Sequence, residues 1–235
     1  MKVALLADIH GNAQALACVL ASAKQLGASR LLIAGDFVGY YYDAGKSFDL
    51  LEPWDWTAIR GNHEDMLRDW HNGRDRAAIL ARYGSGIKAA YLDLTKDKFD
   101  LLTALPEKRE LRIDQRTVLM CHGSPWDPLA YIYPDAPADV REKFAAGGQD
   151  LVLFGHSHYP IVWHQGTTTV VNPGSVGQPR DRIPGACWAL WDTDTRTVSL
   201  HRESYDATPL IAECRRRDPS LHYLQDVLIR SAQSE

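Results

Sequence analysis

Residues 2–37 read KVALLADIHGNAQALACVLASAKQLGASRLLIAGDF, and the fold class can be inferred from the pattern of these residues. Lys2–Ala7 is a short apolar run that ends in polar residues, which is the pattern of a buried strand that leads into a loop. Asn12 can cap the amphipathic helix that follows, and Gly27 suits the end of that helix. Arg30–Ala34 has the pattern of a second buried strand. A strand, a helix and a second strand in this order predict a parallel sheet in the N-terminal half.

The rest of the chain predicts helices on the outside of two sheets. Thr57–Ile59 has the pattern of a third short strand, and residues 64–105 have a mostly helical composition. Seven later segments have strand patterns, several of them in hairpin-like pairs: Glu110–Ile113, Thr117–Cys121, Asp150–Phe154, Ile161–His164, Thr168–Val171, Ala186–Trp191 and Thr197–His201. Thr208–Ala232 predicts one or two closing helices, interrupted at Pro219. We therefore expect parallel strands early in the chain and more antiparallel strands late.

Composition excludes several classes of protein. The 235 residues are 45% hydrophobic and 24% charged, which is typical of a folded domain and excludes extensive disorder. The formal net charge of −4 argues against an extended nucleic-acid-binding surface. No apolar stretch approaches the roughly 20 residues that a membrane span needs, and Asp8 interrupts the apolar start before a signal peptide could form. Four widely spaced cysteines favour reduced thiols, so we expect a cytoplasmic protein with no membrane partner.

Short polar patterns follow apolar segments at several points of the chain. They are Asp8-Ile9-His10, Gly35-Asp36, Gly61-Asn62-His63-Glu64, Cys121-His122-Gly123 and Gly155-His156-Ser157-His158. Because strand ends form the ligand crevice of an open α/β sheet, we expect these side chains to converge. In an extended segment residues i and i+2 point the same way, so Asp8 can act with His10, and His156 with His158. Carboxylate, amide and imidazole together suit Mn²⁺, Fe or Zn²⁺, and the lack of cysteine argues against a structural zinc site.

The ordered set D-x-H, G-D, G-N-H-E, H-G and G-H-x-H resembles the calcineurin-like metallophosphoesterases. Cys121–Pro125 and Asn172–Arg180 resemble loops of a bacterial and archaeal branch, the small phosphodiesterases related to diadenosine tetraphosphatase. The resemblance implies the family's four-layer αββα sandwich, an α/β fold with mixed sheets, which agrees with the strand patterns. We expect a single metallophosphoesterase domain over residues 1–235, with the helical segment 64–105 near the site and a helical tail over residues 206–235.

The resemblance also implies a role for each polar residue. One divalent metal ion would be held by Asp8, His10, Asp36 and His158. A second would be held by Asp36, Asn62, His122 and His156, so that Asp36 bridges the pair. His63 would not be a ligand but would face the phosphate and the leaving group. Manganese is favoured among Mn, Fe, Ni and Zn, which share these ligand types.

The reaction implied is hydrolysis of a phosphodiester or nucleotide by direct attack of a metal-bound hydroxide, without a phospho-enzyme and with inversion at phosphorus. His63 would stabilise the developing charge or protonate the leaving oxygen. The expected partner is a small phosphate ester, with nucleotides among the candidates. The last strands could form a homodimer interface.

Other interpretations stay open at this stage. A non-catalytic scaffold of the same fold, similar to the family's retromer subunit, is the alternative from another class. Scaffold members have lost ligands or the catalytic histidine, whereas this sequence keeps all seven ligand residues and His63. A phosphomonoesterase or a phosphoprotein phosphatase is a further alternative.

Two features outside the ligand set also have two interpretations. Arg180 could bind a substrate phosphate or form an ion pair with Asp181. Tyr40, Tyr41 and Tyr42 either line the crevice, where they could stack on a base, or pack a loop against the core, and packing is favoured.

Overall fold

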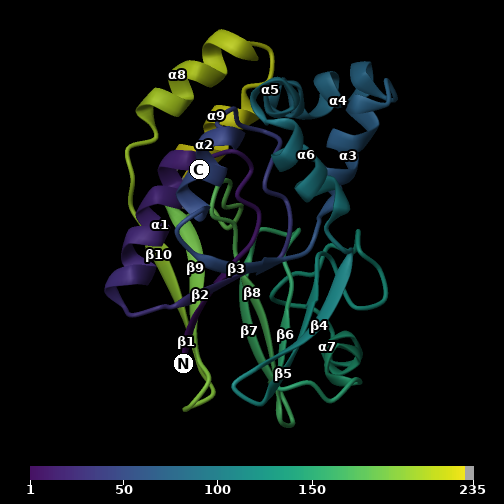
Figure 1. Ribbon diagram of the computed structural model, residues 1–235, viewed down its shortest axis with the longest axis vertical. Coiled ribbons are helices and arrows are strands. Elements are labelled where there is room, and N and C mark those ends of the chain that lie inside the picture. Colours follow the sequence, from purple (N-terminus) through teal and green to yellow (C-terminus); the bar gives the residue numbers. More distant parts are fainter. Residues whose placement is uncertain (231–235) are drawn as a thin grey trace.

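Two five-stranded mixed sheets form the centre of this computed structural model, which describes residues 1–230 (Figure 1). The strands are β1 (Lys2–Leu6), β2 (Arg30–Ile33), β3 (Asp55–Ala58), β4 (Lys108–Ile113), β5 (Arg116–Cys121), β6 (Leu151–Leu153), β7 (Pro160–Gln165), β8 (Thr168–Pro173), β9 (Ala186–Asp192) and β10 (Thr197–Glu203). The strand order is β10-β9-β1-β2-β3 in the first sheet and β4-β5-β6-β8-β7 in the second. Each strand predicted from the sequence is present, with its bounds moved by one or two residues.

The pairing of the strands follows the predicted trend. β1, β2 and β3 are mutually parallel, as the strand–helix–strand unit predicts. The three hairpin pairs β4–β5, β7–β8 and β9–β10 are antiparallel. The second sheet also contains the parallel strands β5, β6 and β8, so each sheet has its own set of parallel strand ends.

The described residues also form α1 (Ala13–Gln25), α2 (Ala44–Leu51), α3 (Asn62–His71), α4 (Arg76–Tyr83), α5 (Gly86–Asp93), α6 (Lys96–Ala104), α7 (Ala138–Ala145), α8 (Thr208–Arg217) and α9 (Tyr223–Ile229). The predicted helical segment 64–105 thus holds most of α3 and all of α4–α6. The predicted C-terminal helix is divided around Pro219 into α8 and α9, and residues 231–235 of the predicted tail lie outside the described residues. The short helices α2 and α7 were not predicted. No helix within residues 1–230 is long and apolar enough to cross a membrane.

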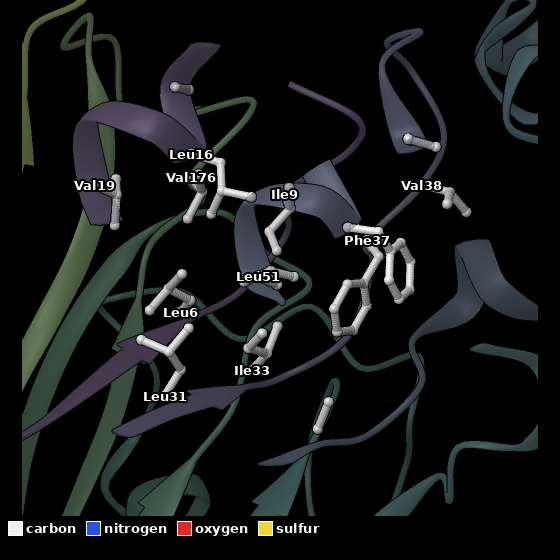
Figure 2. Packing of buried hydrophobic residues seen from close by; sticks show 14 of the residues in the cluster. Leu6, Ile9, Leu16, Val19, Leu31, Ile33, Phe37, Val38, Leu51 and Val176 are labelled. Carbon is white, nitrogen blue, oxygen red and sulfur yellow. The ribbon is translucent and has the colours of Figure 1, made fainter. Parts of the chain in front are cut away.

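Strand β1 shows why the sheets form layers. Ala4 and Leu6 face the helices on the outside, whereas Val3 and Leu5 face the second sheet, and all four are fully buried. Figure 2 shows the outer side, where Leu6 packs among residues of β2, α1 and α2. A strand that is buried on both faces needs an unbroken apolar sequence, which is what β1 has.

The second sheet is covered on its outer face by α7. Phe144 of α7 lies 4.9 Å from the ring of Phe154, which follows β6, and it packs among residues of β5, β7 and β8. Helices, two sheets and a helix therefore form an αββα sandwich, and the predicted fold class is confirmed. Because the two sheets pack face to face, the carboxyl ends of β1, β2, β5 and β6 meet at one edge of the sandwich.

Candidate metal centre

The loops after β1 and β2 bring Asp8, His10 and Asp36 together. All three residues have left-handed backbone, with φ of 56°, 52° and 56°. Backbone bonds from Asp8 to Gly35 (3.1 Å) and from His10 to Asp36 (2.9 Å) join the two loops. The prediction that Asp8 and His10 share an extended segment is therefore wrong, because the chain turns sharply at each residue. Strained backbone of this kind persists only where its surroundings hold it, and it clusters at functional sites.

The first group of polar side chains is Asp8, His10 and His158, all buried, with ligand atoms within 4.8 Å of one another. His10 Nδ1 lies 3.1 Å from the carbonyl oxygen of Val38, and His158 Nδ1 lies 2.6 Å from that of Gln178. Because a carbonyl only accepts, each Nδ1 carries the proton and each neutral ring turns a lone pair on Nε2 inward. Burial lowers the pKa of both rings well below the usual 6.5, so both stay neutral.

The two inward lone pairs face each other. His10 Nε2 and His158 Nε2 are 3.1 Å apart, and Asp8 Oδ1 lies 3.6 Å from His158 Nε2. No hydrogen lies between two acceptors, so this contact is repulsive unless a cation shares the lone pairs. The donor set therefore fits a divalent metal ion.

The second group gathers around His122, whose Nδ1 lies 2.7 Å from the carbonyl oxygen of Ala34. His122 Nε2 lies 3.1 Å from Asn62 Oδ1, 3.2 Å from Asp36 Oδ2 and 3.2 Å from His156 Nδ1. Burial lowers the pKa of His122, but the Asp36 carboxylate outweighs burial and raises the pKa to about 10. The acceptor atoms around His122 Nε2 therefore favour a positive charge at this point, which fits a second metal ion.

The candidate ligand residues follow strands of both sheets. Asp8, His10 and Asp36 follow strands of the first sheet, whereas His122, His156 and His158 follow strands of the second. Asp36 lies between the groups, since its Oδ2 is 3.8 Å from His10 Nε2 as well as 3.2 Å from His122 Nε2. The structure thus brings together all seven residues that the resemblance assigned to metal binding.

His63 lies beside both groups. Its Nε2 is 4.0 Å from Asp36 Oδ2, and its buried Nδ1 has no hydrogen-bond partner. Gly39 makes room for the ring: a Cβ added at this glycine would lie 2.0 Å from His63 Nδ1, and the glycine has φ of +87°. Burial lowers the pKa of His63 to about 4, so the ring is neutral before an anion binds.

The loop after β8, residues 174–180, forms hydrogen bonds that support the first group of side chains. Ser175 Oγ donates to the carbonyl oxygen of Asp8 (2.7 Å), and the carbonyl oxygen of Gln178 fixes His158. A Cβ added at Gly177 would lie 2.0 Å from the carbonyl oxygen of Ile9, so this position requires glycine. The sequence marked this loop only by resemblance, because its contacts are made to residues far away in the chain.

Arg180 ends this loop and points to the site. Its guanidinium donates to the hydroxyl of Tyr40 (2.9 Å) and to Gln178 Oε1 (3.1 Å), and it lies over the Tyr40 ring. Asp181 pairs instead with Arg202, so the ion pair between Arg180 and Asp181 that the sequence left open does not form.

The three consecutive tyrosines pack the loop against the core, as favoured, and all are buried. Tyr40 also borders the site, because its ring lies 4.6 Å from that of His10. Tyr131, for which the sequence leaves the same two interpretations with packing favoured, also borders the site, because its half-exposed ring lies 4.2 Å from that of His156.

Glu64 joins the loops that carry the ligands. Its Oε2 accepts from the backbone N–H groups of Asp36 (2.9 Å) and Gly61 (2.8 Å), and its Oε1 accepts from Phe37 (2.8 Å). The side chain is fully buried. It therefore fixes the backbone at Asp36 and at the start of α3, and it does not face the ligand atoms.

Replacement of Glu64 by Gln should destabilise the protein by about 2–4 kcal/mol, because the amide NH₂ would face a buried N–H donor that loses its acceptor. Urea unfolding followed by circular dichroism measures this change. Glu142→Gln, at an exposed position of α7, is the matched control and should stay within about 0.5 kcal/mol of the wild type. Equal unfolding midpoints for the two variants would contradict the role assigned to Glu64.

Known structures share this fold over nearly the whole chain. The crystal structure of a hypothetical protein from Pyrococcus horikoshii superposes with a TM-score of 0.83 at 24% identity, covering 99% of both chains. The crystal structure of a metallophosphoesterase from Sphaerobacter thermophilus gives a TM-score of 0.77 at 25% identity, covering 97% of this chain and 98% of the other.

Sequence comparison gives the family. A protein of Methanocaldococcus jannaschii, itself described as uncharacterised, is 30% identical over 222 residues, which are 87% of this chain and 88% of the relative. Residues 1–196 match the calcineurin-like phosphoesterase superfamily domain. This chain therefore belongs to the calcineurin-like phosphoesterase superfamily.

Proposed function

We propose that this protein hydrolyses phosphodiesters or nucleotides with the help of two divalent metal ions, Mn²⁺ being favoured. The contact between His10 Nε2 and His158 Nε2 at 3.1 Å carries the proposal, because two neutral acceptors held face to face suit a shared cation. Asp8, His10, Asp36 and His158 would hold one ion. Asp36, Asn62, His122 and His156 would hold the other. When bound, such a pair supplies Lewis-acid stabilisation of phosphate charge and lowers the pKa of water to about 7.

The chain's own residues orient and protonate the substrate. His63 lies beside Asp36 with its ring fixed among buried neighbours, so its Nε2 can reach an oxygen of a phosphate held at the centre. An anionic phosphate favours the imidazolium form, which opposes the lowering of the His63 pKa by burial. His63 would then donate its proton to the leaving oxygen.

Arg180 would bind a phosphate oxygen that does not react. Tyr40 and Gln178 hold one nitrogen of its guanidinium, and a guanidinium can contact phosphate oxygens in a planar, bidentate way. The rival scaffold function is disfavoured by the complete set of ligand types. A scaffold has no need of buried, mutually repulsive acceptors, which cost stability when no cation is present.

The activity is tested with bis-p-nitrophenyl phosphate beside p-nitrophenyl phosphate, on protein stripped with a chelator and reloaded with Mn²⁺. We expect Mn²⁺-dependent turnover that is faster for the diester and lost in Asp36→Asn. Asp139→Asn, at an exposed position of α7, is the control for the loss of one carboxylate and should keep the activity. Folded protein without turnover in Mn²⁺, Fe²⁺, Ni²⁺ or Zn²⁺ would favour the scaffold instead.

Metal affinity should rise with pH. In the metal-free protein burial raises the pKa of Asp8 to about 7, and the Asp36 carboxylate, against the effect of burial, raises the pKa of His122 to about 10. Both groups must lose a proton to become ligands, so the affinity should rise about tenfold per pH unit for each proton displaced: two protons below about pH 7, and the His122 proton alone from there to about pH 9. Titration calorimetry in buffers of different ionisation enthalpy counts these protons. A pH-independent affinity without proton release would contradict the assignment of these two ligands.

His63→Ala should affect esters according to their leaving group. General acid catalysis contributes ~10²–10⁴-fold, and it matters most when the leaving oxygen is basic. We therefore expect a loss of this size for alkyl diesters and a much smaller loss for nitrophenyl diesters, in kcat/KM at constant metal loading. Equal losses for both kinds of ester would remove His63 from the role of the acid.

A further inference from the structure

Two tyrosine rings border His63, and a third extends this group toward the surface. The rings of Tyr40 and Tyr83 lie 4.7 Å and 5.3 Å from the ring of His63, centroid to centroid. Tyr223, the first residue of α9, lies 6.3 Å from Tyr40. Tyr40 is buried, Tyr83 is half-buried, and 40% of Tyr223 is exposed. We name Tyr40, Tyr83 and Tyr223 the tyrosine cluster.

The turn between α8 and α9 fixes this cluster. Asp218 in that turn accepts hydrogen bonds from the hydroxyl of Tyr42 (2.8 Å) and from the backbone N–H (2.9 Å) and hydroxyl (2.8 Å) of Ser85. The hydroxyl of Tyr223 donates to the carbonyl oxygen of Arg82 (2.7 Å). The C-terminal helices are thus tied both to the loop of Tyr40 and to the turn that follows Tyr83. Leu224 of α9 packs in one cluster with Ala89 of α5, and the two helices lie near each other at this end of the molecule in Figure 1.

Tyr40 and Tyr83 belong to the part of the chain that matches the superfamily, whereas Tyr223 lies outside that part. The match to the superfamily ends at residue 196, whereas α8 and α9 cover residues 208–229. Tyr223 therefore comes from outside the pattern that carries the ligand residues. A residue in such a position can alter which substrate is accepted without changing the centre itself.

We propose that Tyr83 and Tyr223 bind the leaving group of the substrate, and that this group is planar and aromatic, as in an aryl or nucleoside ester. The proposal rests on the proposed function, because His63 identifies the side on which the leaving oxygen lies. A planar group beside His63 would contact the exposed parts of both tyrosine rings. Contacts between aromatic rings of this kind are worth up to about tenfold in affinity.

Tyr131 offers an aromatic surface in another place. Its ring is 49% exposed and lies against His156, and it belongs to the loop after β5. Within residues 1–230 the Tyr131 ring contacts those of His156 and Tyr133, whereas Tyr83 contacts His63 directly and Tyr223 contacts it through Tyr40, so Tyr131 marks the alternative position for the aromatic group. Tyr131→Ala therefore serves as the comparison in the test.

The test measures binding of phenylphosphonate and 2-naphthylphosphonate to the Mn²⁺-loaded full chain by titration calorimetry, because their C–P bonds are not cleaved by hydrolysis of an ester. We expect the naphthyl compound to bind about tenfold more tightly to the wild type and to Tyr223→Phe, and at most about threefold more tightly to Tyr223→Ala. The Phe variant keeps the ring and loses only the bond to Arg82. Ile229→Ala, at a 57% exposed position of the same helix, is the matched control and should keep the tenfold ratio.

Several results would overturn the proposal. They are a ratio near one in the wild type, no binding of either compound, an unchanged ratio in Tyr223→Ala, and a loss of the ratio in Tyr223→Phe. If the tenfold ratio were lost in Tyr131→Ala alone, the aromatic group would lie against Tyr131, and this result would overturn the proposal as well. Hydrolysis of bis-p-nitrophenyl phosphate, measured in parallel, separates the two proposals: turnover with a ratio of one rejects only the tyrosine assignment, and a ratio of ten without turnover rejects only the hydrolytic activity.

Discussion

Mutual repulsion among buried acceptor atoms is the constraint on which this structure depends. Five imidazole rings and two carboxylates lie together in one small volume at the edge of the sandwich. Water cannot solvate them there, so the surrounding chain must hold each one in place. It does so through backbone carbonyls that accept from Nδ1 of His10, His122 and His158 and so orient the three rings, and through left-handed backbone at the loop residues. The cost of this arrangement is the reason to infer cations at the centre.

Much of the fold could be predicted because local pattern and tertiary structure agree. The apolar run of β1 is buried on both faces, and Asn12 caps α1 by accepting from Ala15 N–H (3.1 Å), as the sequence indicated. The helices α2 and α7 were missed because each is short, at eight residues, and lacks a side-chain hydrogen bond at its N-cap. Their positions are set by packing: Phe48 of α2 and Phe144 of α7 are buried against the two sheets' outer layers.

The candidate site, too, could be predicted only in part. The ligand types could be predicted because each follows a strand and the family motif fixes their order along the chain. Their backbone could not be predicted, since Asp8 and His10 adopt left-handed conformations that the surrounding loops impose. The partner of Arg180 could not be chosen either, because Tyr40 lies 140 residues away in sequence and Asp181 is adjacent. Contacts made across such separations are decided by packing and leave no local signal.

The division of the ligands between the sheets has a consequence for the molecule as a whole. Asp8, His10 and Asp36 belong to one sheet and His122, His156 and His158 to the other, so an ion held by residues of both would fasten the two layers to each other. Any ligand that binds only the folded state adds its binding free energy to the free energy of unfolding. The concentration of free divalent cation around the protein would then govern its lifetime as well as its turnover. At low free metal concentration the protein would therefore lose the stabilisation that the bound ions give to the fold together with its catalytic activity.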